Sequence, residues 1–109
     1  MAEEKRLQDK ILKDLRSYGK NIVVFKIQKT SDSGVPDVFF ITLFTDSVFI
    51  ELKKTGKSAD ARQRAMIKKL RKTGAKAFIC DTWNGWIKIK KDIGLNSKNI
   101  GNAASLFKK

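Results

Sequence analysis

The sequence contains no histidine, one cysteine (Cys80) and one proline (Pro36) among its 109 residues. Zinc sites and histidine-based catalysis therefore lack their usual residues. A bound metal would be a hard cation held by oxygen ligands, such as magnesium, manganese or calcium. One cysteine allows no internal disulfide, which is typical of a protein from a reducing cytoplasm.

Long apolar runs are also missing. No stretch approaches the roughly 20 residues that span a bilayer. The first residues, MAEEKRLQDK, are charged where a signal peptide needs an apolar segment. We therefore expect a cytoplasmic protein with no membrane partner. The hydrophobic fraction of 41% suits one folded core, so residues 1–109 are expected to form a single domain.

Positive charge is abundant and unevenly distributed. The chain has 24 Lys and Arg against 11 Asp and Glu, a net charge of +13. No Lys or Arg lies between residues 31 and 50, whereas ten lie between 53 and 76. A basic surface without a partner is one interpretation. We favour a polyanionic partner, because each phosphate contact releases counterions. The residues expected to contact a nucleic-acid backbone are Lys54, Lys57, Arg62, Arg64, Lys68 and Lys69.

Apolar periodicity predicts an α/β (α+β) domain with a mixed central sheet flanked by helices. Helices are expected over residues 3–18 and 58–73, the second with Ser58 as its N-cap. The β-branched and aromatic segments expected to form strands are residues 21–29, 37–43, 48–54 and 76–80. The expected order is α-β-β-β-α-β, with the core over about residues 4–81.

The C-terminal part, residues 82–109, is expected to add a hairpin strand and a tail. The segment DTWNGWIKIK suggests a type I′ turn at Asn84-Gly85, with Trp83 and Trp86 paired across it. Stacking of the two tryptophans on exposed bases is the alternative use of these residues.

Charged residues interrupt two consecutive expected strands. Glu51 and Lys53 alternate onto one face, and Asp37 opens the preceding strand. Each alone is an ordinary charge at a strand end. Together, the two carboxylates can share a divalent ion that polarises a phosphoryl oxygen, and the lysine can stabilise developing negative charge.

The shared site requires a particular strand register. Asp37 lies on the Glu51 face only if paired residue numbers have an even sum. We therefore predict a three- or five-residue connection, or a bulge, between these strands. A loop from Phe44 to Asp46 is one way to form it.

Two more polar residues lie on expected helix faces that are otherwise apolar. At 100° per residue, Glu4 projects within about 20° of Ile11, whereas Glu3 projects to the side. Gln63 falls in the centre of the apolar stripe of the second helix. Solvent exposure explains Glu4 alone, and a structural hydrogen bond explains Gln63 alone. The functional interpretation directs both side chains towards the metal-ion site.

These residues together resemble the PD-(D/E)xK nuclease superfamily. The similarity runs from Glu4 through SDSGVPD (31–37) and ELK (51–53) to Gln63. More narrowly, the pattern is similar to the small stand-alone VRR-Nuc domains of phages, although no Val-Arg-Arg string occurs. The resemblance implies a restriction-endonuclease-like αβββαβ core and a Mg²⁺- or Mn²⁺-dependent DNA endonuclease.

The resemblance also implies roles for individual residues: metal ligation by Asp37, Glu51 and the Leu52 backbone carbonyl, catalysis by Lys53, an accessory role for Gln63, and the helix carboxylate for Glu4. It further implies a homodimer that cuts branched DNA such as Holliday junctions, in the host cytoplasm if a phage encodes the chain. The alternative is a basic nucleic-acid-binding module of the same fold that does not cut.

Overall fold

The computed structural model describes residues 2–27, 34–42, 45 and 47–95. The elements follow one another in the order α1 (Ala2–Arg16), the short 3-10 helix η1 (Gly19–Asn21), β1 (Ile22–Lys26), β2 (Val38–Thr42), β3 (Val48–Leu52), α2 (Ala61–Lys72), β4 (Lys76–Cys80) and α3 (Trp83–Ile93). The predicted α-β-β-β-α-β order and the mixed α+β fold class are confirmed. In the described part of the chain, no helix is long and apolar enough to span a bilayer.

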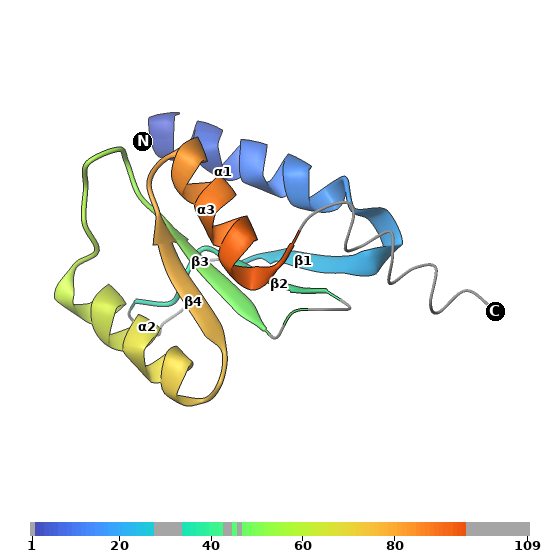
Figure 1. The fold of residues 1–109 in the computed structure, drawn as a ribbon. Coiled ribbons are helices and arrows are strands. Elements are labelled where there is room, and N and C mark those ends of the chain that lie inside the picture. The colour runs from blue at the N-terminus through green and yellow to red at the C-terminus, as the bar shows by residue number, and fades with distance from the viewer. Residues whose placement is uncertain (1, 28–33, 43–44, 46, 96–109) are drawn as a thin grey trace.

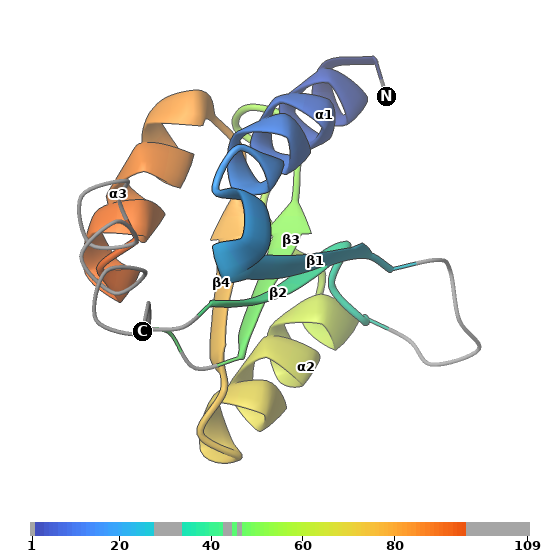
Figure 2. The ribbon, with the colours of Figure 1, turned by 90° about the vertical axis from the view of Figure 1, so that its right-hand side faces the viewer.

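The four strands form one mixed sheet in the order β1-β2-β3-β4. The β1–β2 and β2–β3 pairs are antiparallel, and β4 runs parallel to β3. Helices α1 and α3 cover one face of the sheet, and α2 lies on the other (Figures 1 and 2). Because β3 and β4 are parallel, their carboxyl ends meet at one end of the sheet, which is also where β2 begins.

Strand alternation separates an apolar face from a mixed face. Val38, Phe40 and Ile50 are fully buried in one core cluster with residues of α1 and α3. The opposite face carries the intervening residues, among them Phe39 and Glu51. A period of two in β2 and β3 therefore gives one core and leaves the other face for α2 and for polar side chains.

The hairpin expected over residues 81–90 is wrong, because these residues begin helix α3. Thr82 is the N-cap, and its side chain accepts a hydrogen bond from the Gly85 N–H. Trp86 is fully buried, packs edge-on against Phe40 with ring centroids 6.0 Å apart, and donates its indole N–H to Asp14. The spacing of the buried Trp86, Ile89 and Ile93 is helical. Packing of Trp86 against the core therefore favours a helix over a hairpin in this segment. The expected tail, from residue 96 onwards, lies outside the described residues.

The expected start of α2 also needs correction. The N-cap is Asp60 and not Ser58. Asp60 and Gln63 form a capping box, in which each side chain bonds to the backbone N–H of the other. The reciprocal bonds satisfy two helix N–H groups at once, so the helix begins two residues later than Ser58 would place it.

Candidate active site

The register of β2 and β3 brings the two predicted carboxylates together. Val38 pairs with Ile50 and Phe40 pairs with Val48, so paired residue numbers have the even sum that the shared site requires. Continued by one residue, this register places Asp37 opposite Glu51 on the same face. Five residues separate β2 from β3, which agrees with the predicted three- or five-residue connection. The suggested loop closure by Phe44 and Asp46 lies outside the described residues.

The backbone of β3 holds Asp37 in place. Its Oδ2 accepts a hydrogen bond of 2.8 Å from the Leu52 N–H, and its own N–H donates to the Ile50 carbonyl at 3.1 Å. Burial raises the pKa of Asp37, and the hydrogen bond from Leu52 opposes this rise. The carboxylate is thus fixed in orientation by the strand that carries Glu51.

Glu51 is the buried carboxylate of the site, with only 3% of its surface exposed. Its Oε2 accepts a 2.8 Å hydrogen bond from the Gln63 Nε2 and lies 3.7 Å from the Lys53 Nζ. Its Oε1 is buried and has no hydrogen-bond partner among the described residues. Burial is the main cause that raises the pKa of Glu51 to about 7; the charge of Asp37 adds to the rise, and Lys53 opposes it.

Gln63 connects this carboxylate to the start of α2. Its Oε1 accepts the Asp60 N–H at 3.0 Å as part of the capping box, while its Nε2 donates to Glu51. From the sequence, a structural hydrogen bond and a contact with the metal-ion site were alternatives for Gln63. Its side chain makes both kinds of contact. The first turn of α2 fixes where this amide lies.

Gly34, three residues before Asp37, lies close against the same turn of α2. Gly34 has φ +80°, and a Cβ built at this position would lie 2.5 Å from the Arg62 carbonyl oxygen. Two residues later, Pro36 is fully buried. Only glycine permits this close approach without displacing the backbone. Gly34 lies in the SDSGVPD motif, but the sequence alone did not show that it contacts α2.

The two adjacent glutamates of α1 have different surroundings. Glu4 is partly buried, and its negative charge contributes to the raised pKa of both Asp37 and Glu51. Glu3 instead accepts a 2.8 Å hydrogen bond from the Thr55 N–H with its Oε1. Of the two glutamates, Glu4 is therefore the one whose charge acts on both carboxylates, and Glu3 is engaged with the loop after β3.

The six basic residues expected at a nucleic-acid interface are all exposed, on the loop after β3 and on α2. Arg64 also donates to the Ala59 carbonyl. The alternative in which both tryptophans stack on bases fails for Trp86, which is fully buried. Trp83 is partly buried, with the Lys10 ammonium 4.5 Å from its ring centroid.

The donor set suits a hard divalent cation. Asp37 and Glu51 supply carboxylate oxygens, and Glu51 Oε1 is a buried oxygen without a hydrogen-bond partner in the described part of the chain. No three His, Cys, Asp or Glu side chains gather as a metal site within the described ranges, so a cation here would need ligands beyond these side chains.

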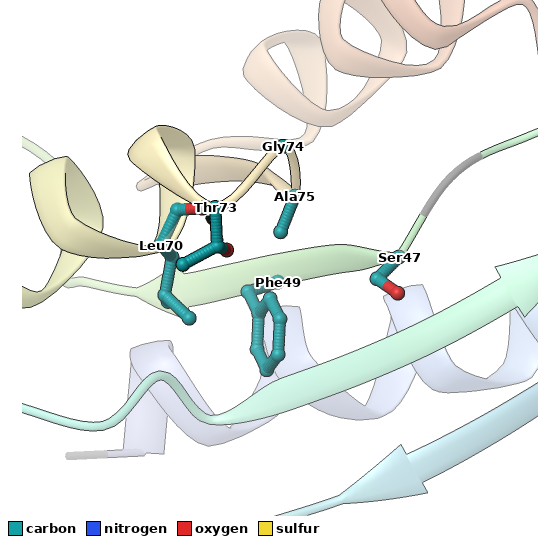
Figure 3. Close-up of a pocket in the computed structure, with 6 residues that line it drawn as sticks. All are labelled: Ser47, Phe49, Leu70, Thr73, Gly74 and Ala75. Carbon is teal, nitrogen blue, oxygen red and sulfur yellow. Dashed lines mark hydrogen bonds between the residues drawn. The ribbon is translucent and has the colours of Figure 1, made fainter.

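A cavity of about 340 Å³ lies elsewhere, between the end of α2 and the start of β3. Figure 3 shows the residues that line it, which are Ser47, Phe49, Leu70, Thr73, Gly74 and Ala75. Glu51 lies at the other end of β3, so this cavity is separate from the carboxylates.

Comparisons with known proteins agree with the fold described above. The family model of the VRR-NUC domain matches residues 2–83. A solved structure described as a VRR_NUC domain has the same fold, with a TM-score of 0.71 and 24% sequence identity, covering 82% of this chain and 95% of that chain. A comparison with curated proteins gave no match. The family match spans every element from α1 to the start of α3, and the chain therefore belongs to the VRR-NUC domain family of nuclease domains.

Proposed function

We propose that the protein is a metal-dependent DNA endonuclease that hydrolyses phosphodiester bonds. The observation that carries this proposal is the buried Glu51 Oε1, which has no hydrogen-bond partner in the described residues. The other oxygen of this carboxylate lies 3.7 Å from the Lys53 Nζ, and the negative charge of Asp37 acts on Glu51. Leaving a buried carboxylate oxygen unpaired is costly unless a proton or a cation satisfies it.

Each residue has a distinct part in this proposal. Asp37, Glu51 and the Leu52 carbonyl would hold Mg²⁺ or Mn²⁺, which when bound supplies Lewis-acid polarisation and a bound water of lowered pKa. Lys53 places a positive charge where negative charge develops on the phosphoryl group. Gln63 fixes Glu51 Oε2, and Glu4 adds negative charge at the start of α1.

The exposed basic residues after β3 and on α2 are proposed to bind the DNA backbone. They lie on the loop and the helix that directly follow Glu51 and Lys53 in the chain. Phosphate contacts of this kind orient a duplex without reading its sequence. This suits an enzyme that selects DNA by its shape, and we propose branched DNA such as a Holliday junction as the substrate.

A homodimer would match the two-fold symmetry of such a junction. The uncovered part of the sheet supports this proposal. Val23, Phe25 and Ile41 are exposed by 55%, 54% and 41%, and β1 is an edge strand. No Lys or Arg lies between residues 31 and 50, so the β2 part of this surface lacks positive charge. An apolar, charge-poor surface suits a second copy of the chain better than DNA.

The nuclease proposal is tested with a labelled four-way junction and a linear duplex in Mg²⁺, Mn²⁺ or EDTA. We expect metal-dependent cleavage that Asp37→Ala and Glu51→Ala abolish and that the exposed-site control Asp92→Asn retains. Binding without cleavage in either metal would instead support the non-catalytic DNA-binding module.

The dimer proposal has a matched pair of variants, because Ile41 and Ile87 are both 41% exposed but lie on β2 and α3. Sedimentation equilibrium should show that Ile41→Lys dissociates the dimer and that Ile87→Lys leaves it intact. A monomeric native protein at all concentrations would contradict the proposed dimer.

A further inference from the structure

The loop between β3 and α2 contains a closed turn, Lys54–Lys57. The Lys57 N–H donates to the Lys54 carbonyl at 2.9 Å, and Gly56 has φ +81°. A positive φ at the third residue is the geometry of a type II turn, which favours glycine there. Lys54 and Lys57 therefore occupy the two ends of a defined turn and are held close together.

Two acidic residues from distant parts of the chain bind the middle of this turn. Glu3 on α1 accepts the Thr55 N–H at 2.8 Å, and Asp81 after β4 accepts the Gly56 N–H at 2.9 Å through its Oδ2. The Thr55 hydroxyl also donates to the Asp81 carbonyl at 3.2 Å. Figure 1 shows the loop passing close to the start of α1 and the start of α3.

The turn is exposed, so its N–H groups do not need a partner from the protein. Water could satisfy both N–H groups, yet each has a carboxylate partner, and the hydrogen bonds from Thr55 lower the pKa of Glu3. The turn follows directly after Lys53, whose N–H donates to the Cys80 carbonyl at 2.9 Å. The lysines of the turn are thus tied to the sheet end that carries the candidate active site.

We propose that Glu3 and Asp81 are positioning residues, which hold the Lys54–Lys57 turn so that its two lysines contact substrate phosphates beside the scissile one. This inference rests on the proposed function. A turn that is already ordered loses little conformational entropy when DNA binds, so fixing it strengthens binding. Without the two carboxylates, the turn and its two lysines would sample a wider range of conformations.

The sign of the effect separates positioning from simple electrostatics. Glu3→Ala and Asp81→Ala each remove a negative charge, and charge alone predicts tighter DNA binding for both. Positioning predicts weaker binding. The variants Glu3→Gln and Asp81→Asn lose the same charge but keep an oxygen that can accept the turn N–H. They are therefore expected to bind nearly as well as the native protein.

The experiment measures binding and exchange separately from cleavage. Anisotropy with a fluorescein-labelled four-way junction in EDTA gives Kd, and hydrogen exchange reports on the Thr55 and Gly56 amides. For Glu3→Ala and Asp81→Ala we expect faster exchange and a Kd and KM raised about threefold to tenfold, with kcat nearly unchanged. Asp92→Ala, exposed on α3, is the control for loss of charge and should not weaken binding.

Two results would overturn the inference. One is a Kd that is unchanged or lower in the alanine variants although their turn amides exchange faster. The other is a loss of kcat at constant KM in Glu3→Ala, which would place Glu3 in the catalytic site. If the native protein binds the junction but never cuts it, the nuclease proposal fails, and the Kd series still decides whether the turn is positioned by these carboxylates.

Discussion

Replacing Glu51 with glutamine should stabilise the protein at alkaline pH in the absence of metal. The pKa of Glu51 is raised from 4.5 to about 7, mainly by burial. That difference corresponds to about 3 kcal/mol of unfolding free energy. Because the side chain is only 3% exposed, solvent screens little of this cost. Glutamine keeps an oxygen that can accept the hydrogen bond from Gln63.

The direction of the pH dependence follows from the raised pKa. Between about pH 4.5 and 7 the folded protein holds a proton on Glu51 that the unfolded chain has released. The stability that this proton contributes is complete below about pH 4.5 and is lost as the pH rises through 7. The glutamine in Glu51→Gln is neutral at every pH. The free energy of unfolding of this variant should therefore equal that of the native protein at pH 4.5 and exceed it by about 3 kcal/mol at pH 8.

Urea denaturation in EDTA measures the difference in unfolding free energy between Glu51→Gln and the native protein at pH 4.5 and at pH 8. Asp92→Asn serves as the control, since it changes the net charge equally at an exposed site. Added Mn²⁺ should stabilise the native protein at pH 8 and leave Glu51→Gln unaffected. An equal gain at both pH values, or no gain at pH 8, would show that Glu51 is not a carboxylate destabilised by burial.

Three further predictions concern single residues. Lys53→Met should lower the cleavage rate about 100-fold to 1000-fold without changing the melting temperature by more than a few degrees, measured with the labelled junction and by circular dichroism. Gly34→Ala should destabilise the fold by more than about 1 kcal/mol, because its Cβ would meet the backbone of α2; urea denaturation checks this. Asp14→Ala leaves the indole of Trp86 and the ammonium of Lys90 without their shared acceptor, and should cost about 1.5–3 kcal/mol when unfolding is followed by tryptophan fluorescence.

The pairing of Asp37 with Glu51 could be tested from the sequence because a side chain on a strand can point to only one of two faces. Alternation fixed the facing of Glu51 and Lys53. The position of Asp37 followed only on the hypothesis of a shared site, which required a register with even sums of paired residue numbers, and the structure has that register. The direction of Glu4 follows from the rotation per residue of α1.

The start of α3 was not predictable in this way. Asn84-Gly85 between two tryptophans fits a hairpin turn as well as a helix start. The helix is favoured by contacts of Trp86 with Phe40 and Asp14, which are far away in sequence. Local pattern contains no information about such partners. The start of α2 was different, since the pair Asp60 and Gln63 has the spacing of a capping box and could have been recognised.

The orientation of the Gln63 amide has a consequence for where Glu51 carries its proton. The Asp60 N–H can only donate, so the Gln63 oxygen must face it and the amide NH₂ must face Glu51. Oε2 of Glu51 therefore receives a hydrogen bond and has Lys53 nearby, which leaves Oε1 as the oxygen to be protonated. A proton and a divalent cation would then compete for the same atom, and the capping of a helix decides which atom that is.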